Sequence, residues 1–133
     1  MELKRQVYDK LVRITRRSAP NEACAYLFDK NTLVIEAFPS QRSPAHFGIV
    51  DTEVVQALIN KYGIPSALFH SHPGGNTPSR RDEQFMTATM KIWNCIWLIM
   101  SSSYNLKAYK ICPVDTKDFG RLVYRHEEVE IVD

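Results

Sequence analysis

The spacing of apolar residues changes repeatedly along this chain between the period of a helix and the period of a strand. Helical spacing first appears over residues 3–14, where apolar side chains recur every three or four positions between charged ones. Pro20 closes this segment, because the residue before a proline is pushed out of the helical region. Helical spacing returns over residues 52–62 and 79–91, with shorter β-favouring runs between the helical segments. This alternation is typical of an α/β domain.

Cap residues mark the ends of the two later helices. Asp51 stands before the second helix, where its side chain can accept a backbone hydrogen bond, and Gly63 follows its last residue. Ser79 stands before the third helix in the same way.

The β-favouring runs predict a hairpin followed by further strands. The hairpin comprises residues 23–28 and 32–38 around a polar turn at residues 29–31, and a loop follows at residues 39–44. The last strand alternates charged and apolar residues, as an edge or one-faced strand does. We therefore expect a two-layer or three-layer α/β fold with a mixed central sheet flanked by about three helices. The later strands are expected at residues 64–71, 92–100, 106–111 and 121–132.

Length and composition indicate one globular domain over residues 1–133. The chain is 44% hydrophobic and 24% charged, unlike a disordered sequence. Its 17 basic and 15 acidic residues are too balanced to indicate a nucleic-acid partner. Residues 96–100 form the most apolar stretch, far short of the roughly 20 residues that cross a bilayer. The first ten residues lack the apolar core of a secretory signal, so we expect no membrane span and a cytoplasmic location.

The three cysteines exclude two common uses of thiols. Cys24, Cys95 and Cys112 are odd in number, widely spaced and without a Cys-x-x-Cys pair. Neither a disulfide framework nor a thiolate zinc site is indicated, and we expect buried, unreactive thiols.

Two histidines at the end of a predicted strand are the first part of a candidate site. His70 and His72 lie two residues apart, so both rings face the same side of a strand. Catalytic zinc sites commonly use imidazoles and a carboxylate, and leave a fourth position for water. Asp82 is the nearest downstream candidate, in the first turn of the third helix, where the helix dipole favours a negative charge. The pattern predicts a zinc site of His70, His72 and Asp82.

Glu22 and Ser79 are candidates for the chemistry beside such an ion. Glu22 directly precedes the first β-run, has no evident packing role, and could act as a general base. A Ser79 hydroxyl near the metal could donate a hydrogen bond to the oxyanion of a tetrahedral intermediate.

Each part also has a purely structural interpretation. The histidine pair could be two polar residues at a strand end, and Glu22 could be a solvated residue after Pro20. Ser79 and Asp82 also fit a helix capping box with no metal involved. His46 and His126 are interpreted as surface residues outside the site.

Taken together, the residues resemble the JAMM/MPN+ (JAB-type) metalloproteases. Glu22, the run His70-Ser71-His72-Pro73, and the pair Ser79 and Asp82 are similar to that family's glutamate, His-Ser/Thr-His-Pro and Ser-x-x-Asp elements, in the same order. Two features depart from the usual pattern. Six residues rather than seven separate His72 from Ser79, and Ala25 stands where a glycine is usual. The short chain resembles the minimal prokaryotic members.

The resemblance implies one MPN/JAMM-like domain with the activity of a zinc-dependent peptidase or isopeptidase. It would hydrolyse an amide bond next to the C-terminal glycines of a ubiquitin-like or sulfur-carrier protein. His70, His72 and Asp82 would bind one Zn²⁺, Glu22 would activate the metal-bound water as acid and base, and Ser79 would stabilise the intermediate. The alternative is a non-catalytic MPN-type scaffold that binds a ubiquitin-like partner. A zinc nucleobase deaminase is disfavoured, because no Pro-Cys-x-x-Cys element is present.

Overall fold

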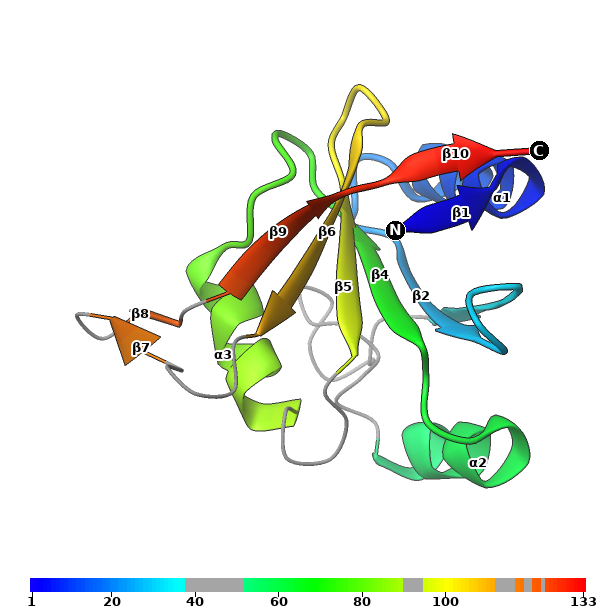
Figure 1. Cartoon of the computed structure of the whole chain (residues 1–133), viewed down its shortest axis with the longest axis horizontal. Helices are drawn as coiled ribbons and strands as arrows, with labels where there is room; N and C mark the ends of the chain where they lie inside the picture. Colours follow the sequence, from blue (N-terminus) through cyan, green and yellow to red (C-terminus); the bar gives the residue numbers. More distant parts are fainter. Residues whose placement is uncertain (38–51, 90–94, 112–116, 119–120, 123) are drawn as a thin grey trace.

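A central sheet of six strands carries the fold of this computed structural model (Figure 1). The structure describes residues 1–37, 52–89, 95–111, 117–118, 121–122 and 124–133. In chain order the elements are β1 (Glu2–Lys4), α1 (Arg5–Ser18), β2 (Cys24–Phe28), β3 (Leu33–Ala37), α2 (Thr52–Tyr62), β4 (Ala67–Ser71), α3 (Arg80–Thr89), β5 (Ile96–Met100), β6 (Leu106–Ile111), β7 (Lys117–Asp118), β8 (Arg121–Leu122), β9 (Tyr124–Glu128) and β10 (Glu130–Val132).

The six-stranded sheet is mixed, as the sequence predicts. Its strand order is β3-β2-β4-β5-β6-β9. β4 and β5 run parallel, whereas the other neighbouring strands pair antiparallel. β9 lies at one edge, which agrees with its exposed charged side chains. β1 pairs in parallel with β10 beside α1, and β7 pairs with β8 (Figure 1).

Helices cover both faces of the sheet, so the fold has three layers. Side chains of α1 pack with alternate residues of β2, β4 and β5 on one face. Residues of α2 and α3 pack with the intervening side chains on the other face. β2 and β4 are therefore buried at every position, which explains the apolar residues throughout β2 and at the first three positions of β4. The first face buries Leu3, Val7, Leu11, Ile14, Ala25, Leu27, Phe69 and Leu98, and the second buries Tyr26, Phe28, Val55, Leu68, Met86, Trp97 and Ile99.

The predicted hairpin and the predicted end of the second helix are confirmed. β2 and β3 pair antiparallel around residues 29–31, all of which have positive φ angles, between 52° and 68°. Gly63 ends α2 with a φ of 84°, a conformation that favours glycine, and its N–H donates to the carbonyl of Ile59 at 2.8 Å. Asp51, the loop at residues 39–44 and residues 90–94 lie outside the described residues.

Three expected boundaries are wrong. Leu3 belongs to β1 rather than to a helix, because it pairs with Ile131 of β10 and is buried there. The single strand expected over residues 121–132 is divided into β8, β9 and β10. The chain leaves the central sheet around Val129 and pairs with β1 instead. β4 begins at Ala67 rather than residue 64, since Ile64 is 62% exposed.

Among the described helices, none has the length and apolarity needed to span a bilayer.

Truncating the inward face of α1 should weaken the whole domain. Leu11 has no exposed surface, so Leu11→Ala should lower the free energy of unfolding by about 3 kcal/mol through lost burial and a cavity. Arg13→Ala, on the exposed side of the same helix, should change it by less than about 0.5 kcal/mol. Urea denaturation measures both. Equal effects of the two substitutions would contradict the placement of α1.

Candidate metal centre

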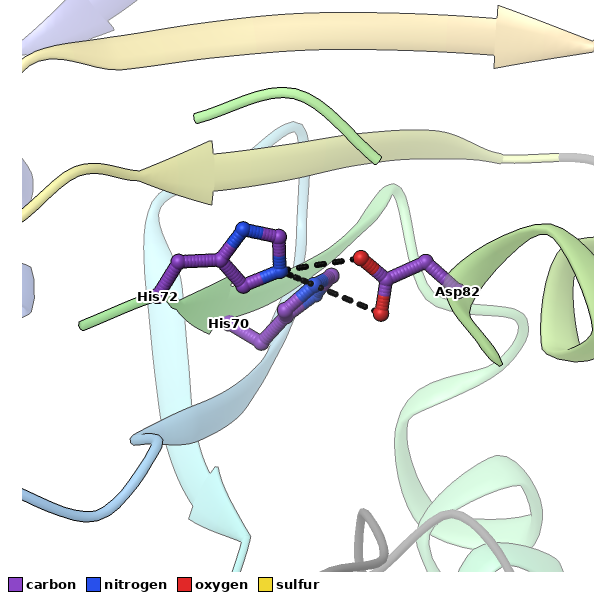
Figure 2. A group of neighbouring side chains, drawn as sticks. All are labelled: His70, His72 and Asp82. Atoms are coloured by element: carbon purple, nitrogen blue, oxygen red, sulfur yellow. Dashed lines mark hydrogen bonds and ion pairs between the residues drawn. The ribbon is translucent and has the colours of Figure 1, made fainter. Parts of the chain in front are cut away.

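Strand β4 and the residue after it bring the two histidine rings together. His70 is fully buried on the face covered by α2 and α3, with its ring edge-on to Trp97 at a centroid distance of 6.1 Å. The N–H of His72 donates to the carbonyl of Met100 at 2.8 Å, which extends the β4–β5 pairing by one residue. Both rings therefore face one side of the sheet, as the strand period predicts, and their Nε2 atoms lie 3.1 Å apart (Figure 2).

Helix α3 supplies the carboxylate. Oδ1 of Asp82 lies 3.0 Å from Nε2 of His70, and Oδ2 lies 2.9 Å from Nε2 of His72 (Figure 2). The Asp82 side chain is buried together with the ring of His70, and His72 is half-buried. The structure thus places all three predicted ligands in one cluster.

The capping box at the start of α3 is also present. The N–H of Ser79 donates to Oδ2 of Asp82 at 2.9 Å, and the N–H of Asp82 donates to Oγ of Ser79 at 3.1 Å. The sequence left a helix cap and a metal ligand as competing interpretations of Asp82. Here one carboxylate makes both sets of contacts, and the cap holds it facing the imidazoles.

The donor set fits a zinc ion. One nitrogen from each histidine and one oxygen of Asp82 lie within 4.8 Å of one another. The two Nε2 atoms lie 3.1 Å apart, and each lies 2.9–3.0 Å from a different oxygen of Asp82, slightly less than the roughly 3.3 Å edge of a tetrahedron with bonds of about 2.0–2.1 Å. Nδ1 of His72 lies 3.1 Å from the carbonyl oxygen of Gly75. With the proton on Nδ1, the Nε2 lone pair is available to a metal.

Burial and hydrogen bonding act in opposite directions on the cluster. Burial alone would raise the pKa of Asp82, but hydrogen bonds from His70 and His72 outweigh it and hold that pKa far below its usual range. The hydrogen bond to Asp82 raises the pKa of His72, against the opposing effect of burial, and the negative charge of Glu22 adds to the rise.

The register of β2 against β4 places Glu22 beside His72. Cys24 lies opposite His70. The N–H of Ser71 donates to the carbonyl of Ala23 at 3.0 Å, and the N–H of Ala23 donates to the hydroxyl oxygen of Ser71 at 2.8 Å. Continued by two residues from Cys24 and His70, this register brings Glu22 to the position opposite His72. The two residues line an open pocket of about 320 Å³. Ser71 was not predicted to have a role; its position between the histidines points its side chain to the opposite face of the strand.

Ser79 lies at the rim of the same pocket, with an exposed side chain. Its Oγ accepts the N–H of Asp82, so the hydroxyl proton can still be donated toward the pocket. The structure thus brings both Glu22 and Ser79 to the edge of the cluster.

Other residues considered from the sequence lie away from the cluster or are buried. Cys24 and Cys95 are in the core, as expected, and burial raises the pKa of the Cys95 thiol to about 12. His126 lies in β9, among exposed charged residues, also as expected. His46 and Cys112 lie outside the described residues.

Fold and site together define a three-layer α/β protein with a His-His-Asp candidate metal centre at one end of β4. The chain belongs to the family of prokaryotic homologs of the JAB domain, whose family model matches residues 4–112. This membership confirms the resemblance found in the sequence. The extent of the domain over residues 1–133 stays a prediction.

Solved structures of similar fold include JAB-type domains. A solution structure of protein DSY2949 from Desulfitobacterium hafniense is 21% identical with a TM-score of 0.67, over 99% of this chain and 92% of that chain. AF2198, a JAB1/MPN domain protein from Archaeoglobus fulgidus, is 16% identical with a TM-score of 0.61, over 100% of both chains. A structure described as a metalloprotease-like JAMM zinc site in the proteasome and signalosome is 16% identical with a TM-score of 0.58, over 100% and 98% of the chains. A comparison with curated proteins gives no significant match.

The stability of the metal-free protein should depend on pH through His72. The pKa of His72 is raised above about 6.5 in the folded state by its hydrogen bond to Asp82. The contribution of protonated His72 to the free energy of unfolding is therefore fully present below about pH 6.5 and is lost as pH rises through the folded pKa. Asp82 stays ionised throughout, since its pKa is far lower. With a chelator present, the stability advantage of the wild type over His72→Gln should therefore shrink by about 1–2 kcal/mol between pH 5.5 and 8.5. A growing advantage over this range in urea titrations would contradict the assignment.

Removing the cap of α3 should lower stability without metal. Ser79→Ala loses the acceptor for the N–H of Asp82 and should cost about 1 kcal/mol, whereas Ser79→Thr keeps an acceptor and should cost less. Thermal unfolding with chelator compares the two variants. Equal losses of thermal stability in the two variants would show that the Ser79 hydroxyl does not stabilise the start of α3.

Proposed function

We propose that this protein is a zinc-dependent peptidase or isopeptidase whose ion is held by His70, His72 and Asp82. The observation that carries the proposal is the convergence of two imidazole nitrogens and a buried carboxylate on one point, beside an open pocket. Three donors of this kind are the protein ligands typical of a catalytic zinc site. A purely structural zinc site would use four protein ligands.

A bound zinc ion supplies a Lewis acid and a nucleophilic water at neutral pH. Glu22 is the general base and then the general acid in this proposal. Its carboxylate is exposed and lines the pocket with His72, so it can take a proton from water and return it to the leaving amine. The buried side chains of His70 and Asp82 are not available as the general base, because they contact each other within the cluster.

Ser79 is the proposed stabiliser of the tetrahedral intermediate. Its hydroxyl proton is not used by the helix cap, and its side chain lines the pocket. A hydrogen bond to the developing oxyanion would strengthen as charge accumulates there.

The proposed substrate is an amide bond next to the C-terminal glycines of a ubiquitin-like or sulfur-carrier protein. Membership of the prokaryotic JAB family supports this class of partner. The pocket is consistent with it, since Gly74 and Gly75 line it and leave space for an extended chain end.

Zinc analysis and a cleavage assay test the proposal together. The purified protein should bind about one zinc per chain and cleave a fusion to a ubiquitin-like protein that ends in Gly-Gly, and a chelator should stop cleavage. Glu22→Gln should lower kcat by about 10²–10⁴-fold while zinc content is unchanged, because the base is lost and the ligands remain. Glu53→Gln, an exposed glutamate on α2, is the matched control and should keep full activity.

Two results would contradict the proposal. Cleavage by Glu22→Gln at the wild-type rate would remove the assigned base. Binding of the ubiquitin-like protein without turnover by the zinc-loaded wild type would favour the non-catalytic scaffold.

A further inference from the structure

The site loop, residues 73–78, connects His72 to Ser79 and contains two glycines. Neither Gly74 nor Gly75 has a positive φ, and a Cβ added at either position would meet nothing within 4 Å. The glycines are therefore required neither by backbone conformation nor by close packing. Their effect is to leave the loop more conformational freedom, which other contacts have to limit.

Hydrogen bonds from the β5–β6 hairpin limit that freedom. The N–H of Ser102 donates to the carbonyl of Gly74 at 2.9 Å, and the side-chain amide of Asn76 donates to the carbonyl of Asn105 at 3.1 Å. The hydroxyl of Tyr109 donates to the carbonyl of Asn76 at 2.7 Å. Figure 1 shows the green segment between β4 and α3 rising beside the yellow β5–β6 turn.

Tyr109 is the most firmly held of these partners. Its side chain comes from β6 and is only 4% exposed. Its ring stacks on that of His126, its neighbour on β9, at a centroid distance of 5.6 Å. A buried hydroxyl in a fixed ring makes a well-directed bond that water cannot easily replace.

We propose that Tyr109 is a positioning residue for the metal centre, and this inference rests on the proposed function. The carbonyl that it binds belongs to Asn76, and the preceding carbonyl, of Gly75, accepts the Nδ1–H of His72. Tyr109 thus holds the peptide next to the one that orients the imidazole, although its side chain does not contact the cluster. Outer hydrogen bonds of this kind set ligand orientation and metal affinity.

The test is Tyr109→Phe, which removes only the hydroxyl. In the metal-free protein, hydrogen exchange of the Ser102 N–H should become faster, because the loop that holds it opens more often. The Nδ1–H of His72, which donates to the carbonyl of Gly75, should be protected from exchange in ¹H–¹⁵N spectra of the wild type and should exchange faster in the variant. Zinc affinity, measured by chelator competition, should fall by about 3- to 10-fold, less than for loss of a direct ligand contact.

Two further variants make the test specific. Tyr8→Phe is the matched control, since that hydroxyl donates to the backbone carbonyl of Tyr104 at 2.9 Å but makes no bond to the site loop. It should leave the exchange of the His72 Nδ1–H and the zinc affinity unchanged. Asn76→Ala removes a different bond of the same loop and should shift them in the same direction as Tyr109→Phe, which keeps the inference testable if that variant does not fold.

The inference is overturned if Tyr109→Phe, or Asn76→Ala in its place, folds with wild-type exchange at Ser102 and at the Nδ1–H of His72 and with wild-type zinc affinity. Equal shifts in Tyr8→Phe would also overturn it. Failure of the proposed function looks different, because the wild type itself would then bind no zinc or cleave nothing, whereas the two exchange measurements need no metal.

Discussion

The rest of the site depends on a buried carboxylate placed between two imidazoles. Asp82 loses its hydration on folding, which would be costly if the charge had no partners. Hydrogen bonds from the histidines and from the backbone of Ser79 replace that hydration and keep the group ionised. The carboxylate can stay buried only while β4, the start of α3 and the site loop keep their relative positions. The candidate metal centre therefore forms only when these three segments are folded together.

The central sheet fixes the remaining geometry through register rather than through loops. Antiparallel pairing of β2 with β4 sets Cys24 opposite His70, and the contacts of Ala23 with Ser71 continue the pairing to the pocket. Parallel pairing of β4 with β5 continues to His72 through its bond to Met100. Groups on rigid strands are held more closely than groups on loops, which suits a site that needs an ion and a base at fixed separation.

The sequence predicted the clustering of His70, His72 and Asp82 better than the edges of the fold. Strand periodicity places two histidines on one side, and a serine three residues before an aspartate predicts a capped helix start, so both signals are local. The pairing of Leu3 with Ile131 is not local, because it joins the two ends of the described chain, and a single apolar residue fits a helix or a strand equally well. The contact of Tyr109 with Asn76 likewise depends on tertiary packing alone. The spacing of residues in neither segment could have indicated this contact.

X-ray absorption spectroscopy of the zinc-loaded protein tests the central claim most directly, because it reports the atoms bound to the ion. The expected spectrum contains nitrogen and oxygen neighbours at about 2.0–2.1 Å, two of them imidazoles, and one position open to water. His70→Ala or His72→Ala should remove one imidazole contribution. A sulfur neighbour at about 2.3 Å, or four protein ligands that close the ion off from water, would contradict the account.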